Sequence, residues 1–463
     1  MTRSFVRLLL GAVIVASLIT CKKPEAPVTE TTASTSTQTP LVVQPQMCDA
    51  ARKNCGDLSQ CVIAPITNKQ AQMPVKPCTV EDHQDYIDIY SWNAFLAMNW
   101  PANTGSCDAD KNKNILNVRS GDNSFVTWQT YMPGENVFVN PGTKRPAQWC
   151  TANGLALGDQ RVFSNEAKSV AFASKLGGAF SRIAEPSNNV LQAAGGVMTD
   201  QSGRWLRFER LMNKMEYDYM VPNRWNALQL QDIKKKGDTL ALPAGVIEVK
   251  SAWKVLTDKE IADKRYFTTK GIVCNDPEGN RTPCDDKPVT MGLVGLHIVH
   301  QTTPGGTLFW STFEQVDNDT VFFDKKITGA PINKDMAKKP YRELDQACKP
   351  VNQPTQVVRV TPIPASKELN AYYQGLLGDS VFKYYRLIST QWTTGAGSSA
   401  FGTPANVANI TLETYVQSNS TKIGQFAATG CFSCHLNSVT VVPGQSGGHS
   451  FFWLEAQYPT MKN

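Results

Sequence analysis

The feature that most constrains the fold is a series of apolar runs in the middle of the chain, each about the length of a β-strand. The runs are rich in β-branched and aromatic residues, and glycine, proline and aspartate turns separate them. They cover residues 245–256, 265–274, 289–301 and 307–316, and a further run covers residues 381–392. The sequence therefore predicts an α+β fold with a central, largely antiparallel sheet.

Helical periodicity occurs on both sides of these runs. Residues 81–98 show it and stop before Pro101, and residues 223–236 show it again. Two further helices are expected at residues 369–377 and 406–417, and the second leads toward a cysteine motif near the C-terminal end. We expect the helices to flank the sheet. The sequence contains no internal repeat and none of the motifs G-x-G-x-x-G, G-x-S-x-G or H-E-x-x-H.

The first 20 residues have the pattern of a secretory signal peptide. Arg3 and Arg7 precede an apolar run over residues 8–19 that is short for a membrane span. The run ends Leu-Ile-Thr before Cys21, which resembles a bacterial lipobox, so we expect Cys21 to be acylated. The alternative is cleavage by an ordinary signal peptidase, which would release the protein from the membrane.

The segment after Cys21 is expected to be a tether. Residues 21–47 are rich in Thr, Pro and Ser and contain no aromatic residue, so they cannot bury enough apolar surface to order the chain. Residues 48–463 are then expected to form a single large α+β domain. The net charge of +6 on 463 residues is mild, and no dense basic stripe with interleaved aromatics is present. Nucleic acid is therefore not expected as a partner.

The motif that indicates chemistry is C-x-x-C-H, formed by Cys431, Cys434 and His435. Two thiols at this spacing bond to the two vinyl groups of haem, and the adjacent histidine reaches the iron as proximal ligand. About 0.003 such matches are expected by chance from the cysteine and histidine content, so we predict one covalently bound haem c. The attachment segment is placed at about residues 405–463. The alternatives are a C-x-x-C disulfide beside a histidine, or half of a zinc site.

The sixth iron ligand has several candidates. His449 lies in a glycine-rich loop, and Met461 lies close to the chain end. His297 and His300 lie in the apolar run 289–301, where residues three apart on a strand point to opposite faces. These two cannot easily bind one metal together, and a structural role for each is the alternative. An open sixth position is a further option.

Twelve cysteines in an exported protein indicate disulfides. Cys274 and Cys284 bracket a polar turn between two apolar runs and are the pair that the sequence supports best. Cys107 with Cys150 is a second plausible pair. The sequence does not fix the remaining connectivity.

Four short runs, SWNAFLAMNWP at 91–101, GLHIVH at 295–300, WSTFEQVDN at 310–318 and LETY at 412–415, accompany the C-x-x-C-H motif. Together they resemble a family of large exported bacterial proteins that carry the label cytochrome c family protein. The resemblance spans roughly residues 86–454. It implies haem binding and electron transfer without indicating a particular reaction. The third run has Gln315 where the family has histidine.

These runs mix buried-looking strands with polar residues, which suggests one hypothesis about a pocket. Six side chains would line a common pocket on adjacent strands, next to the haem. The alternative is that they make the core and cross-strand contacts of the fold. The six are Lys250, Trp253, His297, His300, Glu314 and Asn318.

The sequence favours a lipid-anchored, mono-haem electron carrier on the periplasmic side of a bacterial envelope, with a redox protein as its partner. An alternative is a peroxidase- or oxygenase-like haem enzyme that has an open or displaceable sixth iron site and a small-molecule substrate. His297 or His300 would be its catalytic acid or base. A haem-based sensor or binding module is the second alternative.

Overall fold

The computed structural model describes residues 66–74, 84–122, 124–151, 197–200, 202, 204, 206–271, 289–303, 307–318, 342–344, 363, 365, 367–393, 400–401, 409–412, 431–435 and 438–460. All of them belong to the second of two units into which the chain divides, Met1–Leu41 and Val42–Asn463. The predictions for the signal peptide, the acylated cysteine, the tether, the disulfide between Cys274 and Cys284, and Met461 lie outside the described residues.

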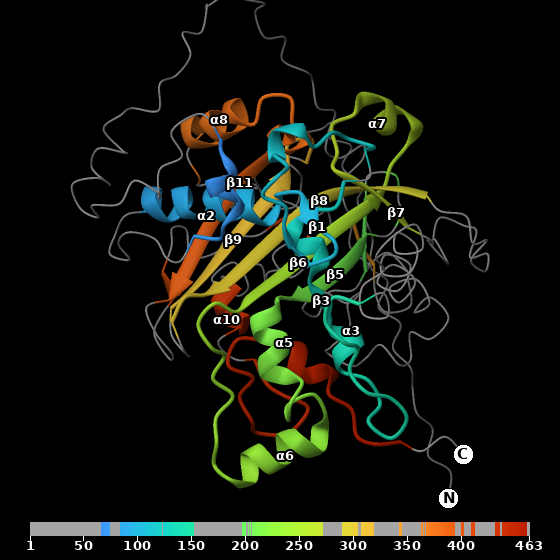
Figure 1. The fold of residues 1–463 in the computed structure, drawn as a ribbon, viewed down its shortest axis with the longest axis vertical. Helices are drawn as coiled ribbons and strands as arrows, with labels where there is room; N and C mark the ends of the chain where they lie inside the picture. Colours follow the sequence, from blue (N-terminus) through green and yellow to red (C-terminus); the bar gives the residue numbers. More distant parts are fainter. Residues whose placement is uncertain are drawn as a thin grey trace, which may run out of the picture. The chain divides into compact units, whose positions relative to one another are not determined.

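An antiparallel sheet forms the centre of the described part (Figure 1). It has eight strands in the order β12-β11-β9-β8-β6-β5-β3, and β7 pairs with β8 in addition. Each of these pairings is antiparallel, which confirms the α+β prediction. The strands are β3 (Met132–Pro133), β5 (Arg207–Met212), β6 (Ile247–Val255), β7 (Thr268–Gly271), β8 (Val289–Gln301), β9 (Leu308–Gln315), β11 (Tyr385–Thr393) and β12 (Ala400–Phe401).

The predicted strands lie close to these bounds, but one strand and one helix differ from their predictions. The run 381–392 begins as a 3-10 turn, Val381–Tyr384, because the Ser380 side chain accepts the Phe382 N–H and caps the turn. In the predicted helix 406–417, residues 409–412 form a turn. There the Asn409 side chain accepts the N–H and the hydroxyl of Thr411, which competes with helical hydrogen bonding.

Two small sheets lie apart from the central one. They pair β1 (Ala102–Asn103) with β2 (Asp108–Ala109), and β4 (Val197–Thr199) with β10 (Arg342–Leu344). Next to β2, Cys107 is joined to Cys150 by a disulfide, the second of the two pairs considered from the sequence.

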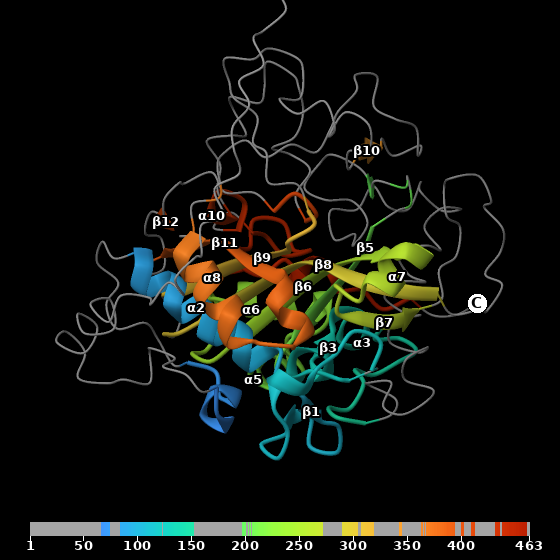
Figure 2. The same ribbon diagram turned by 90° about the horizontal axis from the view of Figure 1, so that it is seen from above.

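Helices lie on both sides of the sheet (Figure 2). The helices α2 (Gln84–Met98) and α8 (Lys367–Leu376) cover one side, which we call the first face. The short helix α10 (Cys431–His435) packs on the other side, the second face. The other helices are α3 (Gly134–Val137), α5 (Lys214–Met220), α6 (Ala227–Lys235) and α7 (Asp258–Asp263). None of the described helices has the length and apolar composition needed to cross a membrane.

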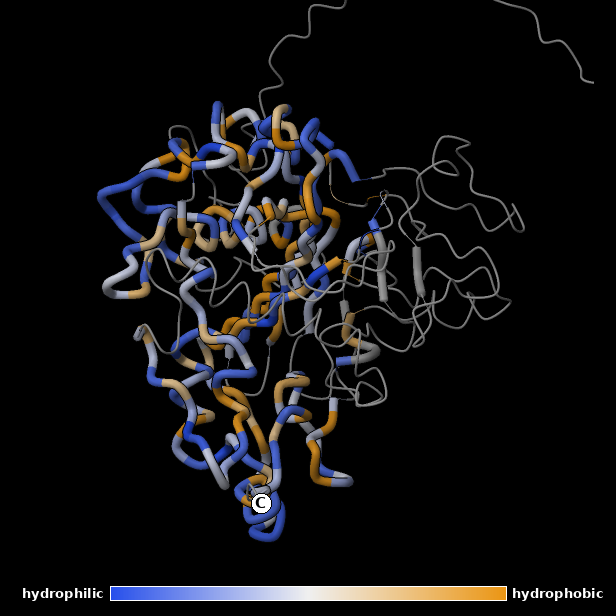
Figure 3. Tube along the Cα trace, turned by 90° about the vertical axis from the view of Figure 1, so that its right-hand side faces the viewer, coloured by the Kyte–Doolittle hydropathy of each residue, from blue (hydrophilic) through white to orange (hydrophobic). Residues whose placement is uncertain are grey.

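The main core lies between the first face and its two helices. Trp92 of α2 stacks on Tyr373 of α8, with ring centroids 4.9 Å apart, and its edge meets Phe313 of β9. The N–H of Trp92 donates to Asn370, whose amide in turn bonds the backbone of Leu387 on β11. These aromatic contacts bind both helices to the sheet. Hydrophobic stretches run through the middle of the described part, whereas hydrophilic stretches lie mostly on its outer loops (Figure 3).

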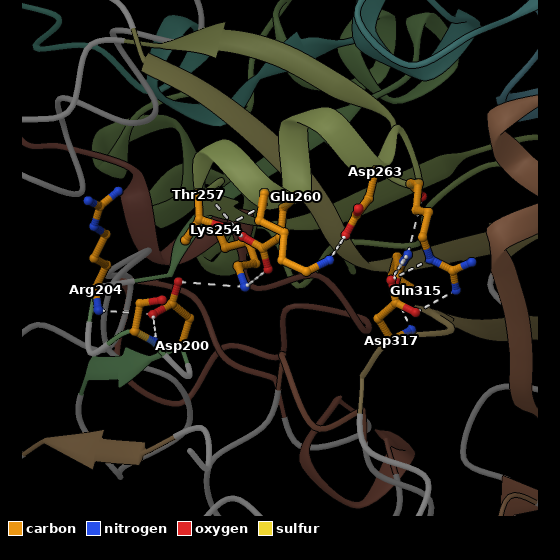
Figure 4. Close-up of polar contacts among 11 residues, drawn as sticks. Asp200, Arg204, Lys254, Thr257, Glu260, Asp263, Gln315 and Asp317 are labelled. Atoms are coloured by element: carbon orange, nitrogen blue, oxygen red, sulfur yellow. Dashed lines mark hydrogen bonds and ion pairs between the residues drawn. The ribbon is translucent and has the colours of Figure 1, made fainter. Parts of the chain in front are cut away.

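A cluster of buried charge fixes α7 beside the sheet (Figure 4). Lys254 of β6 is 3% exposed, and its Nζ lies 2.7 Å from Glu260 and 3.9 Å from Asp200. Nearby, Arg265 pairs with Asp317 at 2.5 Å. A buried lysine is tolerated because carboxylates surround it, so we interpret this cluster as structural.

Candidate functional site

The helix α10 is held on the second face by the strands beneath it. The N–H of Cys431 donates to Oε1 of Gln391 on β11 at 2.8 Å. Cys431 is 5% exposed, Phe432 is fully buried, and both pack against Trp310 of β9 and Val299 of β8. Three neighbouring strands therefore position the first turn of the cysteine motif.

His435 has a defined tautomer. Its Nδ1 lies 2.8 Å from the carbonyl oxygen of His449, and since a carbonyl only accepts, Nδ1 must carry the hydrogen. Burial lowers the pKa of His435 to about 3, and the nearby Lys250 and His297 act in the same direction. The ring is therefore neutral at physiological pH, and the lone pair is on Nε2.

Two aromatic rings pack against the His435 imidazole. The Trp310 ring centroid lies 4.1 Å from it at an interplanar angle of 60°, and the Phe451 ring meets it edge-on at 4.7 Å. The Nε1–H of Trp310 donates to Nδ1 of His297 at 3.1 Å. His297, from β8, is 2% exposed and lies beside Lys250 of β6 across the strands.

His300 lies on the opposite side of the sheet from His435. Its Nδ1 shares a hydrogen bond with the hydroxyl of Tyr90 on α2, and it packs in the core of the first face with Tyr90 and its neighbour Phe309. Burial lowers the pKa of His300 to about 4, so the ring is neutral at physiological pH. The expected separation of His297 and His300 by strand alternation is thus present.

His449 contacts His435 through its main chain. Its carbonyl lies on the Nδ1 side of the His435 ring, which is the side turned away from Nε2. The His449 side chain is 9% exposed, and its Nδ1 has no hydrogen-bond partner among the described residues.

The pocket hypothesis fails, because strand alternation divides the six residues between two faces. Lys250 and His297 lie on the second face, whereas Trp253 packs in the core of the first face. The N–H of Trp253 donates to Glu209. His300 is also on the first face, beneath Tyr90.

The remaining two members of that group support the main chain. Glu314 accepts the Ile410 N–H at 3.0 Å and lies 3.6 Å from Arg386. Asn318 donates to the carbonyl of Val294 at 2.8 Å. Glu314 therefore holds the 409–412 turn, and Asn318 holds the end of β9 against β8. Both contacts agree with the alternative, in which these residues stabilise the fold.

Sequence reasoning missed Trp310, Gln391 and Phe451 as members of this site. Each was visible only as an apolar or polar residue in a strand or tail. Their contacts with α10 depend on strand order, which no local pattern of the sequence encodes. The one signal for Trp310 was its position in a run shared with the resembling family.

The residues present fit a c-type haem. Such a haem needs a neutral imidazole whose Nδ1 is held by a hydrogen bond, so that Nε2 can bind iron, and His435 meets that requirement. The first cysteine of the motif, Cys431, lies buried at the start of the helix that carries His435. Among the described residues, no three His, Cys, Asp or Glu side chains gather into a metal-binding group.

Comparisons of the chain with protein-family models, with curated proteins and with solved structures found no match.

Proposed function

We propose that this chain carries one haem c, bonded through Cys431 and Cys434 with His435 as the proximal ligand, and that it transfers electrons in the bacterial envelope. The observation that carries the proposal is the hydrogen bond from His435 Nδ1 to the His449 carbonyl. It holds the imidazole in the tautomer that binds iron and makes it a better donor. The signal sequence and Cys21 support export and a lipid anchor, with a redox protein as the partner.

A haem held here would supply one-electron chemistry between ferric and ferrous iron. The chain's own residues have separate tasks around it. Gln391 fixes the start of α10, and the His449 carbonyl orients His435. Trp310 and Phe451 pack against the His435 ring and restrict its rotation. A ligand held in one orientation reduces rearrangement between the two oxidation states, which suits electron transfer.

A second candidate is a haem enzyme with an open sixth position. The observation that favours it is the position of the three histidines considered as distal ligands. His297 accepts from Trp310, His300 lies on the first face, and His449 meets His435 on its Nδ1 side. An iron with an open position could bind peroxide or oxygen, as a peroxidase- or oxygenase-like activity requires. A gas or redox sensor would share this property.

The test is expression in a host that matures c-type cytochromes, followed by denaturing electrophoresis with haem staining. The wild type is expected to retain haem after denaturation. Cys431→Ser together with Cys434→Ser should lose it, whereas Cys107→Ser, at a disulfide elsewhere, should keep it. A wild type without covalent haem would contradict the proposal.

Carbon monoxide distinguishes the two candidates. A sharp low-spin reduced spectrum that carbon monoxide does not change is expected for the electron carrier. A high-spin spectrum that shifts with carbon monoxide would favour the enzyme, and peroxide turnover would then be measured.

A further inference from the structure

Trp310 connects the candidate proximal ligand to a second buried histidine. Its ring packs against His435 at 4.1 Å, and its N–H bonds to Nδ1 of His297. Trp310 is 5% exposed and His297 2% exposed, so water does not compete for this hydrogen bond. All three side chains lie on the second face.

The direction of the hydrogen bond assigns a task to His297. Indole nitrogen only donates, so His297 must accept through an unprotonated Nδ1. This acceptor fixes the rotation of the indole about its side-chain bonds. The indole and the Phe451 ring then restrict the rotation of the His435 ring.

Orientation and water exclusion both affect a haem's reduction potential. Ferric haem carries one more positive charge than ferrous haem, so a dry, low-dielectric wall disfavours the ferric state. If the Trp310 ring were free to move, water could enter and stabilise the ferric state. A side chain that holds the Trp310 ring in place therefore influences the reduction potential of the haem without contacting the iron.

We propose that His297 is a positioning residue that acts through Trp310 on His435 and raises the reduction potential of the bound haem. The inference rests on the proposed function. It gives His297 a place beside the proximal ligand, in contrast to the distal or acid–base role considered from the sequence.

The experiment is a potentiometric titration of the haem-loaded protein. His297→Ala and Trp310→Phe should each shift the potential in the negative direction. About a tenfold rise in the ferric-to-ferrous ratio at fixed solution potential is expected, equivalent to about 59 mV for one electron. The double variant should show little further shift, because both changes break one hydrogen bond.

Two further variants serve as controls. His297→Gln keeps an acceptor for the indole and should stay near the wild-type potential, which separates the lost hydrogen bond from a general loss of folding. Tyr90→Phe disturbs His300 on the first face and should leave the potential unchanged. Additive shifts in the double variant, or no shift in His297→Ala, would overturn the inference. New carbon monoxide binding in His297→Ala would overturn it also, because His297 would then be an iron ligand.

A readout without haem distinguishes failure of the inference from failure of the proposed function. In the haem-free protein, the indole N–H of Trp310 should give a protected, downfield proton resonance by NMR, and His297→Ala should remove that protection. If this holds but the wild type binds no haem, the proposed function fails and the positioning pair remains.

Discussion

Glu209 is a carboxyl group buried on the first face of the sheet. It accepts hydrogen bonds from the Trp253 N–H at 2.8 Å and from the Ser251 hydroxyl at 3.1 Å. These bonds lower its pKa, but burial outweighs them and raises the pKa to about 7. Between about pH 4.5 and pH 7, Glu209 therefore keeps its proton in the folded protein, whereas an ordinary glutamate in the unfolded chain has released it.

This difference predicts how stability changes with pH. Between about pH 4.5 and pH 7 the unfolded state binds fewer protons at this site, so stability falls as pH rises, by up to about 3 kcal/mol for this group. Glu209→Gln has no charge to bury. It should lose less free energy of unfolding between pH 5 and pH 8 than the wild type, as measured by urea denaturation.

The control for Glu209 is Asp238→Asn, which removes a carboxyl group at an exposed position. That variant should follow the wild-type dependence on pH. Burial also raises the pKa of Glu455 to about 7, so some of the slope should remain in Glu209→Gln. Equal slopes in the wild type and Glu209→Gln would show that Glu209 is ionised in the folded protein.

Tyr90 and His300 form a polar contact within an apolar core. Tyr90→Phe removes the hydroxyl that shares a hydrogen bond with His300 and leaves the buried Nδ1 without that partner. We expect a loss of about 1–3 kcal/mol in the free energy of unfolding. The haem spectrum should not change, since the pair is on the face opposite α10. A spectral change would mean that the two faces are coupled.

At the scale of elements, Gly295 controls how the turn 409–412 lies on β8. A Cβ built at Gly295 would lie 2.2 Å from the Thr411 hydroxyl and 3.1 Å from Asn409 Oδ1. Gly295→Ala must therefore displace the turn, and we expect it to cost about 1–3 kcal/mol. Thermal unfolding with purified variants measures this loss.

Gly375 in α8 provides the matched control, because a Cβ built there meets nothing within 4 Å. Gly375→Ala should raise stability by about 0.5–1 kcal/mol through helix propensity. If the two glycine variants behaved alike, contact with the turn would not be the reason for Gly295.

The elements that the sequence predicted best have long, regular patterns. The strand β8 has the predicted bounds, 289–301, and α2 ends at Met98 as expected before Pro101. The strand β5 and the helix α5 were missed, because β5 mixes charged and apolar residues without clear alternation and α5 is a short helix. Local sequence patterns only weakly favour the formation of such short helices and strands, which depends mainly on tertiary contacts.

The residues of the candidate site likewise fall into those that the sequence predicted and those that it did not. The C-x-x-C-H motif is local, so Cys431, Cys434 and His435 could be named from the sequence. The opposite directions of His297 and His300 followed from strand alternation. The partners of His435 could not be predicted, because Trp310 and the His449 carbonyl reach it only after β8, β9 and β11 have paired.

At the scale of the molecule, the disulfide between Cys107 and Cys150 closes a loop with a sequence separation of 43. A loop of this length restricts the unfolded chain, and its closure contributes about 3–4 kcal/mol. The double variant Cys107→Ala with Cys150→Ala should lose about that much, as measured by denaturant unfolding under non-reducing conditions. Unchanged stability would indicate that the unfolded chain remains compact without the bond.

The burial of Cys431 has a consequence for how the protein is made. A thiol that is 5% exposed and packed with Phe432 and Trp310 cannot be reached by a haem-attachment enzyme. Under the proposed function, the haem must therefore be attached while α10 is still undocked from the sheet. Biogenesis under this proposal follows a fixed order of export, attachment and closure, because docking of α10 before attachment would block access to Cys431.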